Sequence, residues 1–514
     1  MQTLTPTAVR LNNLSGSAAD LDDSPDSPDG NWCTRLGFTA WTASPSVGTL
    51  RVVGQTPSIP GDLYDWGATT HYVSASATGT GNAGTIGDPW TIAEAMGYNP
   101  SGARTVIEFL PGAYAVSGGG LNSPRAGSYP QYSGTESNPI VFKATNPAAT
   151  SVSDLSTITV SSSGQCLCFY GSPDYVVFDG FKFEPNTGDY TLDDGLSLVS
   201  AYSASVGDSV GCRIVRCLFD THGMGSGTSY NWGCIYIQRF PNLEISDNKF
   251  QNTTGSGSEN LAAILTYSQH ATQIHHNTFV DCARPMFFKG INDTLQNTAT
   301  VHHNLMTGVY VGFDLGGINQ DSNSGWCDFY QNIVVADASL SQSYAGVFRN
   351  YNGTIPRWVR MVNNTFVGFK GANSEAWLWT NTCNGASNLS GCEFRNNVYS
   401  LGSGVRAFYG GYGTLASLQR ITFSNNCYYG STTYLVDHDA TGISLATWQS
   451  TYSEDADSIS SDPLLDGSYK LGTGSPCLDA GLDVLDLLGG GTSGEVNMGA
   501  YILADQSDEI GARS

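Results

Sequence analysis

The alternation of apolar and polar residues recurs in eight aligned segments of the chain. The segments read CRIVRCLF, LEISDNKF, TQIHHNTF, ATVHHNLM, CDFYQNIV, VRMVNNTF, CEFRNNVY and ITFSNNCY, and their aligned anchor residues lie 27 to 33 positions apart. The anchor is Cys217 in the first segment and asparagine in the other seven: Asn248, Asn277, Asn304, Asn332, Asn364, Asn397 and Asn426. A repeat of this length is typical of a solenoid, in which each coil buries its apolar face against its neighbours.

The positions around each anchor alternate with a period of two. The residue three positions before the anchor is always apolar, and so is the residue two positions after it. The first set is Ile214, Ile245, Ile274, Val301, Phe329, Met361, Phe394 and Phe423, and the second is Phe219, Phe250, Phe279, Met306, Val334, Phe366, Tyr399 and Tyr428. Period-two alternation predicts a strand with one buried face. Because the phase of the alternation changes at the anchor, we expect the chain to turn there.

Asparagine at the same turn of successive coils predicts stacking. Asparagine tolerates left-handed backbone geometry, and its amide can form hydrogen bonds along a stack. Stacked strands lie about 4.8 Å apart, so equivalent side chains form ladders. We therefore predict a parallel β-solenoid with the seven asparagines in one turn ladder.

The repeat also places two histidine pairs in neighbouring coils. His275 and His302 fall in one outward column, and His276 and His303 fall in the next column, at the turn. One interpretation is a polar ladder produced by the repeat. The other is a metal or acid–base site made from stacked imidazoles, which a spacing of about 5 Å would allow. No carboxylate column completes such a site, so we assign no metal ligands.

Composition narrows the class of protein. The 514 residues are 40% hydrophobic and only 13% charged, with 61 glycines, which suits many short strands and turns rather than a disordered chain. The formal net charge of −23 makes nucleic acid an unfavourable ligand. It also disfavours an acidic polysaccharide unless a local basic cleft or bound cations intervene.

Cysteine usage and the chain start bear on the compartment. Twelve cysteines in 514 residues, without a CxxC pair, form no dense disulfide framework. The first residues lack the basic and apolar regions of a signal peptide, and no apolar run reaches 18 residues. We expect folding in a reducing cytoplasm, mostly free thiols and no membrane insertion. We assign no cofactor, and no motif indicates Ca²⁺.

Three stretches outside the repeat resemble proteins of the pectate-lyase-like superfamily. Residues 71–96 resemble the entry strand and capping helix of that superfamily, and TVIEFLPGAYAVSGGG (105–120) resembles its first coil. DPLLDGSYKLGTGSPCLDAG (462–481) and NMGAYI (497–502) resemble the closing segment of extracellular β-helix proteins. The resemblance implies an all-β, right-handed, single-stranded parallel β-helix over 71–435 and a C-terminal capping segment over 436–514. It implies fold rather than chemistry, because this architecture hosts lyases, hydrolases, adhesins and viral spikes.

The first 60 residues differ in character. ADLDDSPDSPDGNWCT (19–34) has the loop-like composition of Asp, Ser and Pro, and a strand and a linker at 61–70 follow. The stretch resembles a short module at the front of bacteriophage tail and other virion proteins. That resemblance implies an attachment module over 1–60, although an exposed acidic loop is the alternative.

Candidate ligand-contacting residues lie on the third strand of each coil. Aromatic rings beside charged groups suit carbohydrate, because sugars stack on rings and form hydrogen bonds at their edges. The carbohydrate-binding candidates are Arg239, Tyr267, Arg349, Trp377, Trp379 and Tyr409. Trp377 and Trp379 could also face the core.

Candidate catalytic residues follow from two reactions. A glycoside hydrolase needs two carboxylates about 5 to 9.5 Å apart, for which Glu259, Asp281, Asp314 and Asp321 are available. A lyase needs a base beside a neutralised uronate carboxylate. ARPMFFKGIND (283–293) resembles the lysine-bearing coil of alginate- and chondroitin-type lyases, which implies Lys289 as the base. The next coil lacks the partner arginine of that pattern, and Lys289 could instead pair with Asp293 at the surface.

Taken together, these features predict a bacteriophage tailspike or tail fibre that contacts a host surface glycan, with depolymerase activity possible. We expect a homotrimer on the virion, bound to other virion proteins through its N-terminal module. The alternatives are an extracellular polysaccharide lyase or glycoside hydrolase of bacterial origin, and a purely structural virion decoration protein.

Overall fold

The computed structural model describes most of the β-helical part of the chain. The described residues are 9–11, 50–52, 66–116, 129–145, 156–160, 165–170, 173–185, 197–202, 209–223, 232–253, 261–267, 270–289, 298–316, 326–349, 357–371, 375–379, 391–410, 421–430, 435–436, 442–482 and 493–500. The chain divides into two compact units, Met1–Trp66 and Gly67–Ser514. In the first unit, β1 (Val9–Leu11) pairs antiparallel with β2 (Leu50–Val52). The acidic stretch 19–34 lies outside the described residues.

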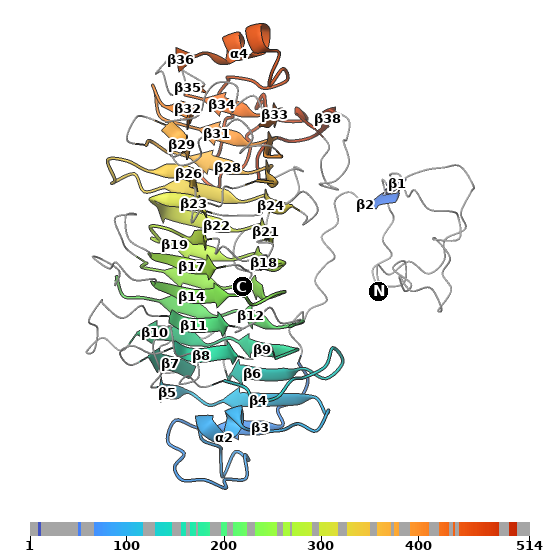
Figure 1. The fold of residues 1–514 in the computed structure, drawn as a ribbon, viewed down its shortest axis with the longest axis vertical. Helices are drawn as coiled ribbons and strands as arrows, with labels where there is room; N and C mark the ends of the chain where they lie inside the picture. Colours follow the sequence, from blue (N-terminus) through green and yellow to red (C-terminus); the bar gives the residue numbers. More distant parts are fainter. Residues whose placement is uncertain are drawn as a thin grey trace. The chain divides into compact units, whose positions relative to one another are not determined.

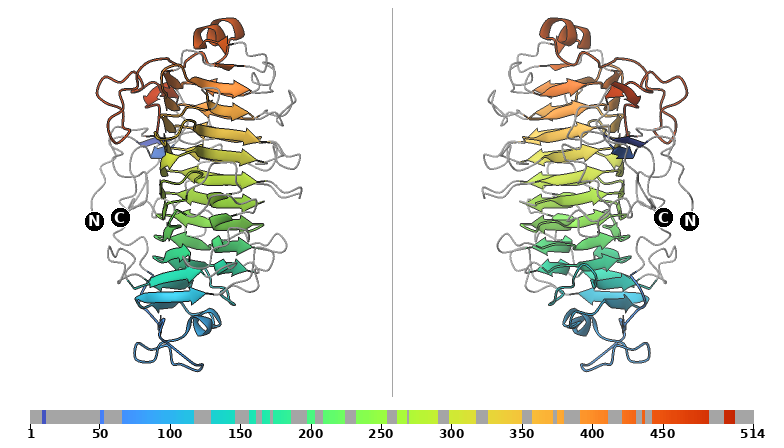
Figure 2. Two further views of the ribbon diagram at one scale, coloured as in Figure 1. Left: turned by 90° about the vertical axis from the view of Figure 1, so that its left-hand side faces the viewer. Right: turned by 90° about the vertical axis from the view of Figure 1, so that its right-hand side faces the viewer.

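The second unit consists of three parallel sheets whose strands succeed one another along the chain (Figures 1 and 2). Sheet 1 contains β3 (His71–Val73), β4 (Thr105–Phe109), β6 (Ile140–Ala144), β9 (Val176–Asp179), β12 (Arg213–Val215), β15 (Glu244–Ser246), β18 (Thr272–His275), β21 (Ala299–His302), β24 (Cys327–Tyr330), β27 (Val359–Val362), β30 (Glu393–Arg395) and β33 (Thr422–Ser424). Sheet 2 contains β5 (Gly112–Val116), β7 (Ser156–Val160), β10 (Lys182–Pro185), β13 (Leu218–Asp220), β16 (Lys249–Gln251), β19 (Thr278–Val280), β22 (Leu305–Val309), β25 (Ile333–Ala336), β28 (Thr365–Val367), β31 (Val398–Ser400) and β34 (Cys427–Tyr429).

Sheet 3 contains β8 (Gln165–Tyr170), β11 (Ser197–Tyr202), β14 (Trp232–Gln238), β17 (Leu261–Tyr267), β20 (Met286–Lys289), β23 (Val311–Gly316), β26 (Tyr344–Arg349), β29 (Glu375–Trp379), β32 (Arg406–Gly410), β35 (Leu435–Val436) and β36 (Gly442–Ile443). All strand pairs within the three sheets are parallel except β35–β36. Successive strands in one coil therefore belong to different sheets, which is the architecture of the predicted parallel β-helix.

The apolar columns predicted from the repeat form the core. Every residue three positions before or two positions after an anchor is at most 4% exposed. Identical rings stack from coil to coil, as in Phe219–Phe250 and Phe250–Phe279, whose ring centroids are both 4.7 Å apart. The predicted buried face is confirmed.

The anchor asparagines form one buried ladder from Asn248 to Asn426. Each amide nitrogen of Asn248, Asn277, Asn304, Asn332, Asn364 and Asn397 donates to the amide oxygen of the next asparagine over 2.9 to 3.1 Å. The same oxygen accepts a backbone N–H, so each side chain satisfies polar groups in the helix interior. The predicted turn ladder is confirmed.

The left-handed residue of this turn is the one before the anchor, not the asparagine itself. Arg216, Asp247, His276, His303, Gln331, Asn363, Asn396 and Asn425 all have φ between +52° and +57°. This position tolerates varied side chains because its backbone is held by the flanking strands. The predicted position of the turn along the coil is correct, but the left-handed residue was expected one position too late.

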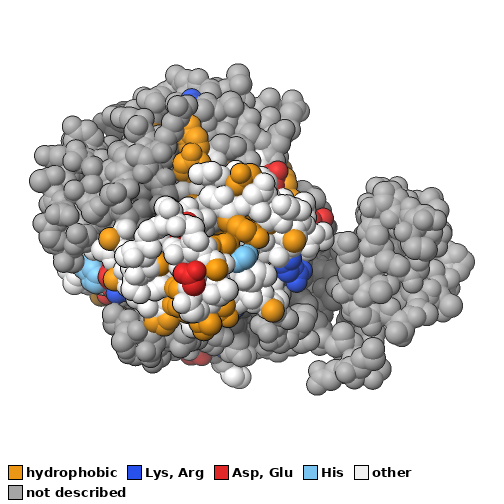
Figure 3. All heavy atoms as spheres, turned by 90° about the horizontal axis from the view of Figure 1, so that it is seen from below, with side chains coloured by type: hydrophobic (Ala, Val, Ile, Leu, Met, Phe, Trp, Pro, Cys, Tyr) orange, Lys and Arg blue, Asp and Glu red, His pale blue; other side chains and the backbone are white. Residues whose placement is uncertain are grey.

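Both ends of the described helix carry capping elements. At the first end, α2 (Ile92–Met96) follows β3, and its N-cap Thr91 forms a capping box with Glu94. Figure 3 views this end and shows polar surface with scattered apolar side chains and few charges. At the other end lies α4 (Leu445–Tyr452), which buries Trp448.

The last described segment runs back along the turn column. It includes β37 (Gly481–Leu482), paired antiparallel with β38 (Ser493–Val496). Asn425 donates to the carbonyl of Ala480, Asn363 to that of Asn497 and Gln331 to that of Ala500. Left-handed turn residues of successive coils thus bind the backbone of the closing segment.

The eight cysteines whose side chains the structure describes are buried thiols that form no disulfide with one another. No described helix has both the length and the hydropathy needed to cross a membrane.

Candidate functional site

The outward face of sheet 3 gathers charged and aromatic side chains on four neighbouring strands. In β17 and β20, Leu265 pairs with Phe287 and Tyr267 pairs with Lys289. Phe288, between the two outward residues of β20, belongs to the core. Phe287 and Tyr267 belong instead to a small apolar cluster separate from the core.

The face continues onto β23 and β26. Asp314 lies beside Phe287, and Gly316 lies beside Lys289. Arg349 follows Gly316 in the same column. Strand register thus sets Tyr267, Lys289, Gly316 and Arg349 in one row along the helix axis.

Lys289 is the most unusual titratable group in this row. Its residue is 0% exposed, and its ammonium nitrogen (Nζ) lies 3.0 Å from the Tyr267 hydroxyl. Nζ also lies 4.5 Å from the centroid of the Phe287 ring, within the range of a cation–π contact. Burial, followed by the positive charges of Arg284 and Arg349, lowers the pKa of Lys289 to about 7, although Asp314 opposes the shift. A substantial fraction of this amine is therefore neutral near neutral pH.

Asp314 is the carboxylate of the site and is fully buried. One of its oxygens accepts a hydrogen bond of 2.7 Å from Nε of Arg349, and the other lies 3.1 Å from Nε of Arg284. Arg284 is buried, with its guanidinium 4.7 Å from the Phe287 ring centroid, whereas 36% of the Arg349 side chain is exposed. Two arginines thus contact one carboxylate, whose negative charge also acts on Lys289.

We name the six residues of this site the Lys289 cluster: Tyr267, Arg284, Phe287, Lys289, Asp314 and Arg349. The cluster is a local excess of positive charge in a chain whose formal net charge is −23. Anions are therefore attracted to this face although the whole chain repels them.

Several sequence candidates fall in or beside the cluster. Tyr267, Lys289, Asp314 and Arg349 come together within it. Arg239 follows β14, and its backbone N–H donates to the carbonyl of Tyr267. Register, read from strand alternation, was sufficient to find these residues.

Other candidates lie elsewhere. Tyr409 on β32 is half-buried, and the guanidinium carbon of Arg406 lies 5.9 Å from its ring centroid. Asp281 lies in the turn between β19 and β20 with φ of +52°, on a different part of the coil. Glu259, Asp321 and Asp293 lie outside the described residues.

The expectation that Trp377 contacts sugar is wrong. Trp377 is 0% exposed and packs edge to face against Phe394 in the core, at a centroid distance of 5.1 Å. It pairs with Gly346, where a side chain would collide with the indole, so the missing side chain makes room for it. The backbone of Trp379 pairs with core residue Phe348, and its side chain lies outside the described part of the structure.

Arg284 and Phe287 were not predicted as site residues. Phe287 shares the outward parity of Lys289 and could have been found from it. Arg284 precedes Pro285, at a bend before β20 begins, so strand alternation gives no information on its direction. Only the folded coil brings its guanidinium to Asp314.

Comparison with known proteins finds similarity of fold. No protein-family model and no curated protein matches the chain. Among solved structures, pectate lyase Pel9A is 14% identical, with 84% of this chain and 96% of that chain covered and a TM-score of 0.42. XylC in complex with xylose is 12% identical, with 77% and 87% covered and a TM-score of 0.45. A tailspike protein mutant of E. coli bacteriophage HK620 in complex with pentasaccharide is 15% identical, with 80% and 68% covered and a TM-score of 0.32.

Proposed function

We propose that this protein binds an acidic polysaccharide on the outward face of sheet 3, with a sugar carboxylate at the Lys289 cluster. The observation that carries the proposal is that Arg284 and Arg349 contact the single carboxylate of Asp314 while Lys289 lies close enough to feel its charge. Such an arrangement leaves positive charge for a second, ligand carboxylate. Arg349 is the exposed residue of the three, so the ligand carboxylate would contact it first.

The row along the helix axis suits an extended polymer. Successive strands lie about 4.8 Å apart, close to the length of one sugar unit in an extended chain. Gly316 adds no side chain between Lys289 and Arg349, so these two residues are neighbours in the row. The rings of Tyr267 and Phe287 supply apolar surface beside them.

Cleavage of the bound glycan is supported by the lowered pKa of Lys289. In the proposed β-elimination, neutral Lys289 removes the proton on the carbon next to the uronate carboxylate. The released electron pair forms a carbon–carbon double bond, and the bond to the leaving glycosidic oxygen breaks. That oxygen takes a proton from the Tyr267 hydroxyl, which recovers it from the Lys289 ammonium, so the site returns to its starting state. Arg349 stabilises the charge that develops on the carboxylate.

The test separates binding from cleavage. Purified protein is incubated with neutral and with uronate-containing polysaccharides, and binding and unsaturated chain ends are measured. We expect Lys289→Arg to retain binding but lose cleavage, because arginine keeps the charge and cannot act as a base near neutral pH. Arg349→Ala should weaken binding itself. Failure of wild-type protein to prefer any acidic glycan over a neutral one would refute the proposal.

The proposal also includes the particle on which this protein would bind its glycan. The stretch DDSPDSPDGNW favours a phage virion, where a homotrimer would bind a host surface glycan. Adsorption of the purified protein to host cells, and its loss from particles when residues 1–60 are deleted, would support that setting. Particles that retain the truncated protein would argue against the anchor.

A further inference from the structure

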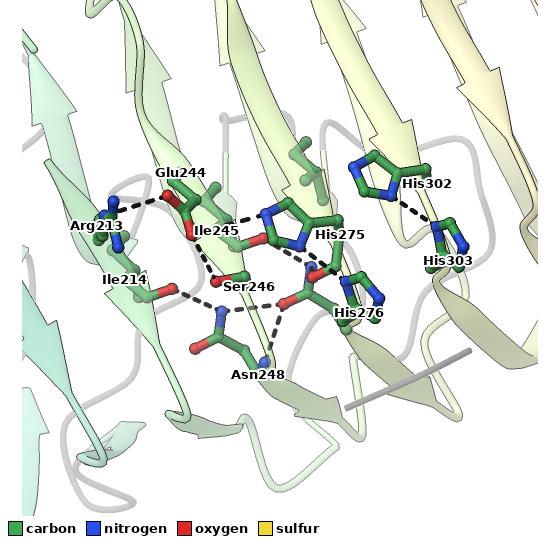
Figure 4. Close-up of polar contacts among 12 residues, drawn as sticks. Arg213, Ile214, Glu244, Ile245, Ser246, Asn248, His275, His276, His302 and His303 are labelled. Carbon is green, nitrogen blue, oxygen red and sulfur yellow. Dashed lines mark hydrogen bonds and ion pairs between the residues drawn. The ribbon is translucent and has the colours of Figure 1, made fainter. Parts of the chain in front are cut away.

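A second cluster of ionisable side chains lies on sheet 1, in the coils that bear the two histidine pairs (Figure 4). His275 and His302 pair in register on β18 and β21, and their rings stack with centroids 4.8 Å apart and planes 7° apart. His276 and His303, at the left-handed turn positions, stack at 4.9 Å and 12°. The two columns predicted from the sequence are therefore present.

Within each coil the two imidazoles meet through their Nδ1 atoms. The Nδ1–Nδ1 distance is 2.9 Å between His275 and His276 and 2.7 Å between His302 and His303. Two such nitrogens in contact need one proton between them, since one must donate and the other must accept. A metal ion can take the place of that proton.

The His275–His276 pair has a feature that metal-binding histidines commonly share. Nε2 of His275 lies 3.6 Å from a carboxylate oxygen of Glu244, which also contacts Arg213 at 3.2 Å. Figure 4 shows Glu244 on the far side of the His275 ring from His276. A carboxylate at Nε2 favours a proton there, which leaves the lone pair of His275 on Nδ1, toward His276.

The separation of the two nitrogens selects a geometry. Two nitrogens each about 2.0 to 2.1 Å from a metal lie about 2.8 to 3.0 Å apart at a right angle, and about 3.3 Å apart at a tetrahedral angle. The observed 2.9 Å fits neighbouring positions of a square-planar or tetragonal ion. Copper(II) and nickel(II) prefer that geometry, and imidazole suits both.

We propose that His275 and His276 bind one divalent ion that prefers square-planar or tetragonal coordination, such as copper(II), through their Nδ1 atoms. On binding, the proton leaves Nδ1 of His276 and is taken up at Nε2 of the same ring, so both imidazoles stay neutral. Among the described residues, no three His, Cys, Asp or Glu side chains are grouped as a metal site, so water completes the coordination. His275, with 18% of its side chain exposed, gives the ion access, and the net charge of −23 favours a cation. A second ion at His302 and His303 would lie about one strand spacing away and be repelled by the first.

The repeat itself supplies substitutions that suit the fold. In other coils of the helix, Ser246 stands at the position of His275 and Asn363 stands at that of His276, so His275→Ser and His276→Asn place residues this helix already accepts. The matched control is the double variant His302→Tyr with His303→Gln, which copies Tyr330 and Gln331. Unchanged circular dichroism and thermal midpoint verify the fold of each variant.

The experiment titrates full-length protein with copper(II) in the presence of glycine, which removes weakly held ions. We expect one ion per chain and an electron paramagnetic resonance spectrum with coupling to two imidazole nitrogens. His275→Ser or His276→Asn should weaken binding at least 100-fold, and Glu244→Gln by about 10- to 100-fold. The control double variant should bind within about threefold of wild type.

Two results would overturn the proposal. One is copper binding of equal affinity in wild type and in His275→Ser or His276→Asn, which would show adventitious surface binding only. The other is loss of binding in the control double variant but not in those two, which would place the ion at the other pair.

Discussion

The buried asparagine ladder gives the sharpest test of what holds the coils together. Asn304 stands in its middle and makes bonds to both neighbouring coils. Its amide oxygen accepts from the backbone N–H and the side-chain amide of Asn277, both at 3.0 Å. Its amide nitrogen donates to the carbonyl of Ile274 and to the amide oxygen of Asn332, both at 2.9 Å. The amide nitrogen also lies 2.9 Å from the carbonyl of His302. Asn304→Ala removes all five contacts at once.

The size of the effect follows from what is left behind. The backbone N–H of Asn277 and the carbonyl of Ile274 lose partners in an interior that water does not reach. A buried donor or acceptor without its partner costs about 1 to 3 kcal/mol, so these two groups together cost about 2 to 6 kcal/mol. We expect Asn304→Ala to lower the free energy of unfolding by about 3 to 5 kcal/mol. Thr300→Ala, on the outward face of β21 in the same coil, should change it by less than about 0.5 kcal/mol.

Two measurements check the prediction. Denaturant unfolding followed by circular dichroism gives the difference between the two variants. Native-state hydrogen exchange gives the protection of the Asn277 amide, which should fall most in Asn304→Ala because it loses its acceptor. If the two variants unfold within about 1 kcal/mol of each other, the ladder contributes little stability and the reasoning fails.

Three further predictions concern the core and the Lys289 cluster. Phe279→Ala should destabilise by about 3 to 5 kcal/mol, because its buried ring stacks on Phe250; a change under 0.5 kcal/mol would contradict its inward position. Lys289 has a folded-state pKa lowered to about 7, so the unfolded state binds more protons between pH 7 and about 10. The stability of wild type relative to Lys289→Met should therefore rise with pH across that window, by up to about 1.4 kcal/mol per pH unit, and parallel pH profiles in thermal or denaturant unfolding would contradict the shift. Asp314→Asn should destabilise by about 3 to 5 kcal/mol, because the buried Arg284 loses its counter-ion, and an unchanged denaturation midpoint would argue against that pairing.

The sequence predicted the architecture because the same physical demands repeat in every coil. A residue such as Phe279 is buried in the same way as Phe250, so eight weak patterns reinforce one another. The assignment of the left-handed residue failed for a physical reason. Both His276 and Asn277 are compatible with a turn. Only the hydrogen bonds that link Asn277 to Asn248 and Asn304 show that the asparagine side chain points into the helix interior.

Only those site residues that lie within strands could be predicted, because alternation gives the direction of their side chains. Lys289, Tyr267 and Arg349 share one register column, so their proximity follows from the repeat. Trp377 shows the limit of the method, because its direction depends on the space that Gly346 leaves in the neighbouring coil. The lowered pKa of Lys289 depends on burial and on nearby charges, neither of which is encoded in local spacing.

The two-sided bonding of the ladder has a consequence for how such a chain can change in length. If the 27 residues from Asn277 to His303 were lost, His276 would precede Asn304, and both His276 and His303 already have left-handed φ, at 54° and 53°. Asn248 would then meet Asn304 as it now meets Asn277, and we expect the core columns to close without a gap, which the melting temperature of the shortened protein would test. We therefore expect such a chain to lengthen or shorten by whole coils. Because β20 lies within that segment, such a deletion would also remove Lys289, so a change in the number of coils would change the Lys289 cluster as well.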